Sequence, residues 1–188
     1  MTKDQILAAA AQIFSQKGYH GTSMQDIALA VHLQKGSLYH HVSSKQEILY
    51  DLLNHALELL TEKVTAAISR ETDPEARLRA AIKAYLTTLA EYQELAAVML
   101  LEHRSLEPKY RTLHIPHRDR FERIWRDLIQ EGKNAGVFDS SDASMSARAI
   151  LGVANWTVTW YRKDGPMTSA EIADQFANLF LKGLLKRN

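Results

Sequence analysis

Residues 22–49 read TSMQDIALAVHLQKGSLYHHVSSKQEIL, and this stretch decides the fold of the first part of the chain. Ser23 and Asp26 are three residues apart, the spacing of a capping box, which predicts that a short helix begins there. His32 lies where the helical pattern stops. Residues 34–42 then have the pattern of another helix. The stretch therefore predicts two short helices joined by a tight turn.

The pattern on either side of this stretch predicts two further helices. Apolar residues recur at helical spacing over residues 6–14, and Gly18 follows as a helix stop. Ser44 and Glu47 form a second capping box, which predicts a fourth helix that runs to about residue 69. One supporting helix before two short ones is the layout of a helix-turn-helix, a motif that binds DNA.

The third predicted helix has the dimensions and the chemistry of an element that reads DNA. Nine helical residues span about 13 Å at ~1.5 Å per residue, close to the roughly 12 Å width of the major groove. Gly36 removes a side chain where the backbone approaches the duplex, and Lys45 at the next helix start can hold a phosphate. The predicted DNA contacts are Thr22, Ser23, Gln34, Lys35, Gly36, Ser37, Tyr39, His40 and Lys45.

Alternative interpretations stay open for several of these residues. Tyr39 can pack in the core instead of binding phosphate, and the side chains of Gln34 and Lys35 can simply be solvated. The pair His40 and His41 does not indicate a metal site, because adjacent helical residues point about 100° apart.

At these residues the chain resembles the TetR family of bacterial transcriptional regulators. The resemblance covers residues 3–53 and is carried by residues 6–14, 18–23, 26–28, 35–42 and 44–49. The chain departs from the family at His32, where Gly is usual, and at Gln34, where Ser or Thr is usual. The resemblance implies a helix-turn-helix domain over residues 1–50 and a ligand-binding and dimerisation domain over residues 51–188. It also implies a dimer that binds a palindromic operator in double-stranded DNA.

Helical periodicity continues through the rest of the chain. It predicts a helix that begins at Pro74, a helix over residues 95–101 buried nearly all round, and another around residues 121–129. Residues 108–116, which begin and end with a proline, are expected to be poorly regular. Ser141-Asp142 and Ser169 are predicted to cap the last two helices. We therefore expect an all-α protein of about nine helices.

The middle helices are predicted to enclose a small-molecule effector, because pockets between helices are mainly apolar with a few polar anchors. Residues 103–126 contain seven Lys or Arg and three acids, a local excess of +4 that suits an anionic head group. The alternatives are an ordinary aromatic core and a solvated basic helix face. The candidate ligand-binding residues are Tyr85, Leu89, Tyr92, Met99, Arg104, Arg118, Phe121, Trp125, Trp156 and Trp160.

A second resemblance concerns residues 104–185. This part is similar to the C-terminal half of a TetR subgroup, on residues 152–156, 160–161, 165–166, 171–174 and 181–184. The subgroup includes repressors of fatty-acid degradation and of sterol-ring catabolism, which respond to acyl-CoA thioesters. The resemblance implies a repressor that is released by an amphiphile such as an acyl-CoA. The alternative is a repressor that responds to a drug or another apolar metabolite and controls an efflux or catabolic gene.

The last two helices are the candidates for a dimer interface, and the predicted contact residues lie on the terminal one. Its large apolar side chains lie beside a small glycine, and two such helices from each subunit would form a four-helix bundle. The alternative is a core within one subunit. The predicted interface residues are Phe176, Leu179, Phe180, Gly183 and Leu184.

Composition excludes several other classes of protein. The net charge is +1 and there is no Cys, so disulfides and thiolate metal sites are excluded. No apolar run reaches the length of a membrane span and no signal peptide is recognisable, so we expect a cytoplasmic protein. No nucleophile elbow, phosphate loop or zinc-protease motif is present, which argues against an enzyme. No cofactor or metal is expected, and a helical carrier that does not bind DNA is the third alternative.

Overall fold

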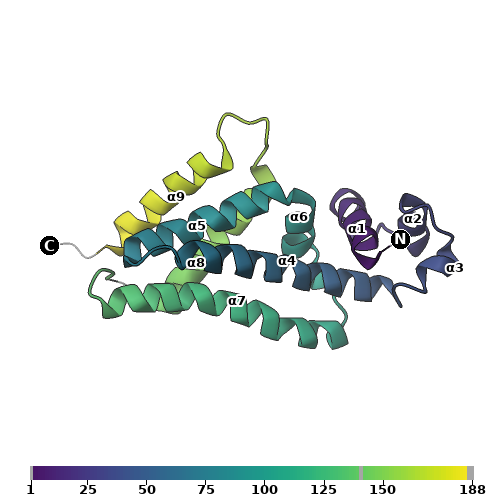
Figure 1. The fold of residues 1–188 in the computed structure, drawn as a ribbon, viewed down its shortest axis with the longest axis horizontal. Helices are drawn as coiled ribbons and strands as arrows, with labels where there is room; N and C mark the ends of the chain where they lie inside the picture. Colours follow the sequence, from purple (N-terminus) through teal and green to yellow (C-terminus); the bar gives the residue numbers. More distant parts are fainter. Residues whose placement is uncertain (1, 140–141, 186–188) are drawn as a thin grey trace. The chain divides into compact units, whose positions relative to one another are not determined.

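The computed structural model describes residues 2–139 and 142–185. Its elements are α1 (Lys3–Lys17), α2 (Met24–Ala30), α3 (Lys35–Leu38), α4 (Lys45–Ile68), α5 (Pro74–Glu91), α6 (Gln93–Leu101), the 3₁₀ turn η1 (His103–Ser105), α7 (Pro108–Asn134), α8 (Ala143–Trp160) and α9 (Ser169–Leu184) (Figure 1). Over the described residues the only extended pairing is one antiparallel bridge between Phe138 and Leu185. The prediction of an all-α protein with about nine helices is confirmed.

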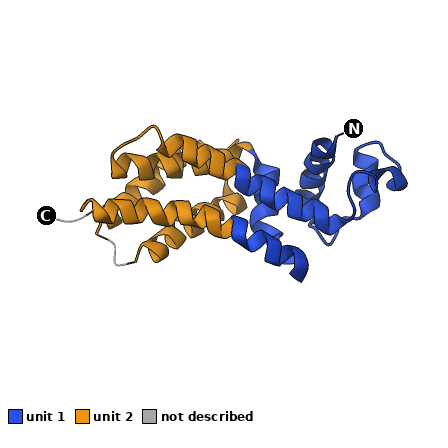
Figure 2. Cartoon of the chain, turned by 60° about the horizontal axis from the view of Figure 1, so that its bottom comes forward, with its two compact units in different colours: residues 1–58, 92–117 blue, residues 59–91, 118–188 orange. Residues whose placement is uncertain are grey.

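The chain divides into two compact units (Figure 2). Unit 1 comprises residues 1–58 and 92–117, and unit 2 comprises residues 59–91 and 118–188. This division differs from the expected boundary at residue 50, because α6 packs against α1 and so joins the N-terminal helices. Helices α4 and α7 each begin in unit 1 and end in unit 2.

Unit 1 contains the three predicted N-terminal helices. Helix α1 ends at Gly18, whose φ of 74° only glycine adopts easily. Helix α2 begins at the predicted capping box, in which Ser23 and Asp26 bond each other's backbone N–H. Leu38 and Val42 are buried at 0% and 2% exposure, so the inward face of the third helical segment lies in the core as its apolar spacing indicates.

Unit 2 is built around α5, which packs along α9 and also contacts α8. Ala173 and Ala177 are fully buried on α9, and their small side chains let this helix approach a neighbour closely. Tyr85, Trp125 and Ile129 are among the large buried side chains of this unit. Together they form an apolar interior that the helical periodicity predicted.

The predicted nine-residue third helix is wrong, since α3 has only four residues. Gln34 is its N-cap but makes no side-chain cap hydrogen bond, and Gly36 weakens the helix from inside. After α3 the backbone tightens: the N–H of His40 donates to Ser37 O at 3.2 Å and that of His41 to Leu38 O at 3.0 Å. A short helix followed by a turn therefore replaces one long helix.

The irregular stretch expected over residues 108–116 is also wrong. Pro108 is the first residue of α7, where its missing N–H costs nothing, and Pro116 lies inside the same helix. His114 explains why the helix continues: it is buried, and its Nδ1 lies 2.8 Å from Oδ1 of Asn54 on α4. Packing thus outweighs the local cost of an internal proline.

Three smaller predictions need correction. Helix α6 is not buried all round, because Leu101 is 56% exposed. Thr168, not Ser169, is the N-cap of α9 and forms a capping box with Glu171. Asp142 caps α8 as predicted, whereas Ser141 lies outside the described residues.

Candidate functional site

Most of the predicted DNA contacts lie on the surface around α3. Tyr39 is 46% exposed, and a Cβ added to Gly36 would meet no atom within 4 Å. These positions provide hydrogen-bond donors around an open patch of backbone. The exposed residues of this surface are Gln34, Lys35, Gly36, Tyr39 and His40, with Ser37 half-buried among them.

Thr22 and Ser23 have different positions. Thr22 is only 2% exposed, and its hydroxyl donates to Gly18 O at 2.9 Å, so in the free protein its side chain is engaged within unit 1 and does not support the predicted DNA contact. Ser23 is exposed, and its hydroxyl donates to Asp26 Oδ2 at 2.5 Å. This hydrogen bond lowers the pKa of Asp26 to about 2 and keeps the N-terminus of α2 capped by a carboxylate.

Lys45 is held inside unit 1 instead of pointing freely toward a phosphate. Its Nζ donates to Tyr19 O at 2.8 Å and to Thr22 O at 2.5 Å, and it lies 4.3 Å from the centroid of the Tyr19 ring. Burial lowers the pKa of Lys45. The ammonium therefore fastens the connection between α1 and α2 to α4, a structural role that the sequence pattern did not reveal.

An aromatic cluster lies at the centre of unit 2. The ring centroid of Tyr85 is 5.7 Å from that of Phe121 and 5.5 Å from that of Trp125. The Tyr85 hydroxyl donates to Oδ1 of Asn155 at 2.5 Å, and burial raises the pKa of Tyr85, so this hydroxyl stays neutral. Asn155 is a polar neighbour that the sequence reasoning missed, since nothing in its local pattern marks it.

Trp125 is the least ordinary member of this cluster. It is fully buried, and its Nε1 has no hydrogen-bond partner among the described residues. A buried indole N–H without an acceptor costs about 1–3 kcal/mol. Unit 2 thus keeps an unused donor next to the rings of Tyr85 and Phe121.

The other candidate ligand residues belong to both units. Leu89 and Met99 are buried, in unit 2 and unit 1 respectively, whereas Tyr92 is 38% exposed. Trp156 and Trp160 are 66% and 45% exposed on α8, so within this chain they are not enclosed, and their contact with a ligand stays a prediction.

The basic segment contains both paired and unpaired cations. Arg118 is exposed and pairs with Asp119 at 3.3 Å, and Arg111 Nη2 donates to Leu106 O at 2.8 Å. Of the arginines in this segment, only Arg118 forms an ion pair with a residue in the described ranges; the guanidinium groups without one are those of Arg104, Arg111, Arg120, Arg123 and Arg126.

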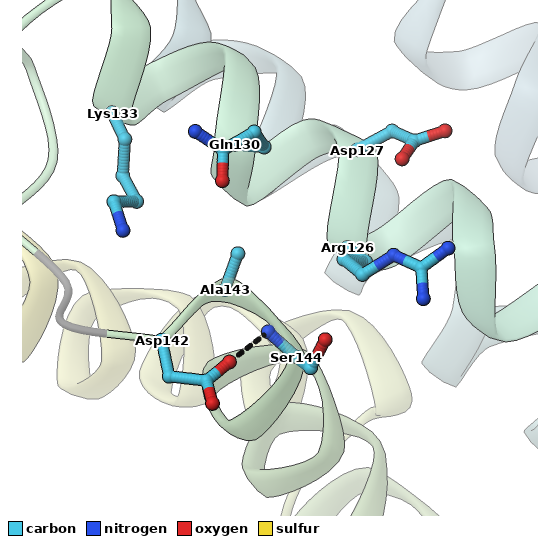
Figure 3. A pocket seen from close by; sticks show the side chains of 7 residues that line it. All are labelled: Arg126, Asp127, Gln130, Lys133, Asp142, Ala143 and Ser144. Carbon is cyan, nitrogen blue, oxygen red and sulfur yellow. Dashed lines mark hydrogen bonds between the residues drawn. The ribbon is translucent and has the colours of Figure 1, made fainter.

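A hollow with a volume of about 340 Å³ lies between α7 and the start of α8. Figure 3 shows the side chains that line it. The residues that line it include both basic and acidic side chains. The Lys133 side chain extends toward α8, whereas the Asp127 side chain points away from the hollow. Asp142 Oδ1 accepts the N–H of Ser144 at 2.7 Å. None of the predicted ligand residues lines this hollow; its lining consists of Arg126, Asp127, Gln130, Lys133, Asp142, Ala143 and Ser144.

Apolar side chains are exposed on α8 and α9. On α9, Leu179 is 64% exposed, and Phe176, Phe180 and Leu184 are half-buried next to the exposed Gly183. On α8, Met145, Val153, Trp156 and Trp160 recur at helical spacing and are all at least 40% exposed. The two tryptophans therefore share a helix face with other exposed apolar residues, and the predicted interface residues remain available to a partner.

Metal-binding clusters and membrane-spanning helices are both missing from the part of the chain that the structure describes. Residues 2–139 and 142–185 contain no group of three or more His, Asp or Glu side chains arranged to hold a metal ion. None of the helices described is long and apolar enough to cross a bilayer.

Two family models match the chain, one at each end. A model described as bacterial regulatory proteins of the tetR family matches residues 6–52, and a model of the tetracyclin repressor-like C-terminal domain matches residues 71–184. The two matches cover the helix-turn-helix and most of the remaining helices.

Three known proteins resemble the chain over nearly its whole length. The HTH-type transcriptional repressor KstR2 of Mycobacterium tuberculosis is 27% identical over 98% of this chain and 93% of its own. The regulator PfmR of Thermus thermophilus is 39% identical, with a TM-score of 0.88 over 98% of this chain and 100% of its own. AibR, solved in complex with isovaleryl coenzyme A and operator DNA, is 27% identical, with a TM-score of 0.88 over 94% of this chain and 96% of its own.

Proposed function

Because the chain belongs to the TetR family of bacterial regulatory proteins, we propose that it is a ligand-responsive transcriptional repressor that binds operator DNA as a dimer. The observation that carries the proposal is the polar surface around α3, which lies within the segment matched by the N-terminal family model. The relatives are named as regulators, and we assign no catalytic activity to this chain.

The DNA contacts that we propose are those exposed around α3. Lys35 and Tyr39 donate to phosphates or base edges, and Gly36 lets the backbone approach the duplex. Ser23 is exposed beside the cap of α2 and stays in the proposed set, although its hydroxyl is bonded to the Asp26 carboxylate in the free protein. Lys45 supports this surface from beneath rather than binding DNA itself.

A dimer is required because one short recognition element reads only a few base pairs. The exposed apolar faces of α8 and α9 provide the surface: Leu179 on one and Trp156 on the other are both about two-thirds exposed. An isologous contact between two copies would bury these side chains in a four-helix bundle.

The effector that we propose is an acyl-CoA thioester. AibR, which resembles this chain over nearly all its length, was solved with isovaleryl coenzyme A. The apolar interior around Tyr85 and Trp125 suits an acyl chain, and the unused Trp125 N–H suits a carbonyl acceptor. The unpaired guanidinium groups suit the phosphates of coenzyme A.

The effector releases the protein from DNA if it binds more tightly to a conformation of the dimer that cannot bind the operator. Half-sites lie on a fixed helical repeat, so a shift of a few ångströms between the two recognition elements breaks register. Helices α4 and α7 run from one unit into the other without a break and are two of the covalent routes for such a shift. A coupling of about 1–3 kcal/mol changes operator affinity about 5–150-fold.

The test of DNA binding uses duplexes selected by the protein from a randomised library. We expect a palindromic consensus, and affinity that falls as salt increases, because phosphate contacts release counterions. Lys35→Ala should weaken binding about tenfold or more. Lys109→Ala removes an exposed cation outside the α3 surface and is the control that should leave affinity unchanged. Binding without sequence preference would contradict the proposal.

The test of the effector titrates the protein–operator complex with isovaleryl-CoA, palmitoyl-CoA and free coenzyme A. We expect one of the thioesters to weaken operator binding and free coenzyme A to have little effect. If no thioester changes operator affinity, the effector proposal fails while the DNA-binding proposal stands. An apolar drug that releases the complex instead would support the alternative, a repressor that controls an efflux or catabolic gene.

A further inference from the structure

Gln46 is a buried amide in the first turn of α4 with three hydrogen bonds to two other segments. It is 8% exposed. Its Nε2 donates to the Tyr19 hydroxyl at 2.8 Å and to Ser105 O at 2.9 Å, and its Oε1 accepts the N–H of Glu107 at 2.9 Å. Both the oxygen and the nitrogen of the Gln46 amide therefore make hydrogen bonds, and all of their partners lie within unit 1.

The two segments that Gln46 joins have different roles in the proposed function. Tyr19 lies between α1 and α2, in the helix-turn-helix. Glu107 immediately precedes Pro108, the first residue of α7, and α7 carries Phe121 and Trp125 in unit 2. One amide thus fastens the start of the helix that carries the candidate effector residues to the base of the DNA-binding helices.

The surroundings of Gln46 make this connection stiff. Tyr19 is only 5% exposed, and its carbonyl accepts the Lys45 ammonium at 2.8 Å. The Oγ of Ser105 lies 3.3 Å from His20 Nε2. A displacement of residues 105–107 must therefore either move the connection between α1 and α2 or break hydrogen bonds of a buried amide, and a broken bond there costs about 1–3 kcal/mol.

We propose that Gln46 is the positioning residue that couples the start of α7 to the DNA-binding helices. Through its hydrogen bonds, the conformation that binds the effector and the conformation that binds the operator exclude each other. The inference rests on the proposed function and assigns to one side chain the regulation of that site. Because coupling between two sites is reciprocal, DNA bound to the helix-turn-helix must also stabilise the Gln46 contact with Glu107.

The main experiment compares wild type with Gln46→Met, which keeps the length of the side chain and removes all three hydrogen bonds. Operator Kd is measured with and without a saturating amount of the acyl-CoA that releases the wild type. We expect Gln46→Met to retain operator binding and to reduce the effector-induced change in Kd about fivefold or more. Tyr19→Phe removes only the bond to the helix-turn-helix, and should reduce the change in the same direction if Gln46→Met folds poorly.

A matched control separates coupling from stability. Asn54→Leu also removes a buried amide of α4 bonded to α7, through His114, but the Asn54 side chain makes no hydrogen bond with α1 or α2 among the described residues. We expect Asn54→Leu to lower the melting temperature and to leave the effector-induced change in Kd intact. Equal loss of coupling in Asn54→Leu and Gln46→Met would reduce Gln46 to a stabilising residue and overturn the inference.

A second measurement needs no effector. Amide hydrogen exchange of residues 102–107 is followed with and without the selected duplex. In wild type, DNA should slow exchange of the Glu107 amide several-fold, and Gln46→Met should abolish this protection. If the wild type selects no duplex, the proposed function and the inference fall together. If it binds DNA and Gln46→Met keeps both the protection and the effector response, the inference alone is overturned.

Discussion

His32 has the most demanding backbone conformation among the non-glycine residues that the structure describes. Its φ is 56°, and it is the one non-glycine residue with a positive φ in residues 2–139 and 142–185. The left-handed region disfavours a Cβ, and β-branched residues most of all. The backbone of His32 is therefore strained in the turn between α2 and α3. The family usually has glycine at this position, which adopts the same conformation without strain.

The first prediction tests that strain by substitution. His32→Gly should raise the free energy of unfolding by about 0.5 kcal/mol, because relief of strain exceeds the added chain entropy, and His32→Val should lower it by about 1 kcal/mol. Urea denaturation followed by circular dichroism measures both. If the two variants had equal free energies of unfolding, the positive φ at residue 32 would not be a source of strain, and the prediction would be wrong.

The second prediction concerns the pH dependence of the cap on α2. The folded-state pKa of Asp26, about 2, is below its ordinary value of 3.8, so its contribution to stability is fully present above about pH 4 and is lost as the pH falls toward 2. Asp26→Asn should therefore lower the urea midpoint at pH 7 and match the wild type near pH 2. Ser23→Ala removes the partner hydroxyl and should show the same trend, and a pH-independent difference would contradict it.

At the scale of elements, the C-terminal end of α7 depends on one glycine. A Cβ on Gly132 would lie 2.1 Å from Cδ2 of Phe138, a ring that is only 4% exposed. The chain therefore folds back over the end of α7 in a way that a side chain at residue 132 would prevent. Gly36 in α3 is the contrasting case, because nothing lies within 4 Å of a Cβ there.

The third prediction uses these two glycines as a pair. Gly132→Ala should lower the free energy of unfolding by about 1–3 kcal/mol, since overpacking outweighs the gain in helix propensity. Gly36→Ala should raise it by about 0.5–1 kcal/mol and at the same time weaken operator binding, because a methyl group then separates the backbone from the duplex. Thermal denaturation and binding to the selected duplex measure the two effects. A neutral Gly132→Ala would show that Phe138 moves aside easily.

At the scale of the whole molecule, function requires two copies. The fourth prediction is that Leu179→Glu converts the dimer to a folded monomer and weakens operator binding about 100-fold or more, because each half-site then binds alone. Light scattering reports the mass and circular dichroism reports the fold. Leu101→Glu places the same charge on another leucine that is more than half exposed, and should leave the dimer intact. If the Leu179→Glu variant were still a dimer, the dimer interface would not include this face of α9.

Local sequence patterns predicted the elements whose causes are themselves local. The capping box at Ser23 and Asp26, the stop at Gly18 and the apolar spacing through Leu38 needed only neighbouring residues, and the structure confirms all three. The sequence predicted the all-α class because the helical spacing of apolar residues can be recognised within each segment separately. The polar character of the α3 surface followed for the same reason.

Only the tertiary structure decided what depends on partners distant in sequence. Pro116 stays helical because Asn54 holds the neighbouring His114, and Lys45 has no free ammonium because Tyr19 and Thr22 lie against it. Burial, hydrogen-bond partners and exposure are properties of the packed chain, since a residue's local pattern does not contain the segments that will surround it. That is why the sequence by itself determined the all-α class and the kind of surface that the helices present, and packing determined the extent of some helices and which side chains remain available for binding.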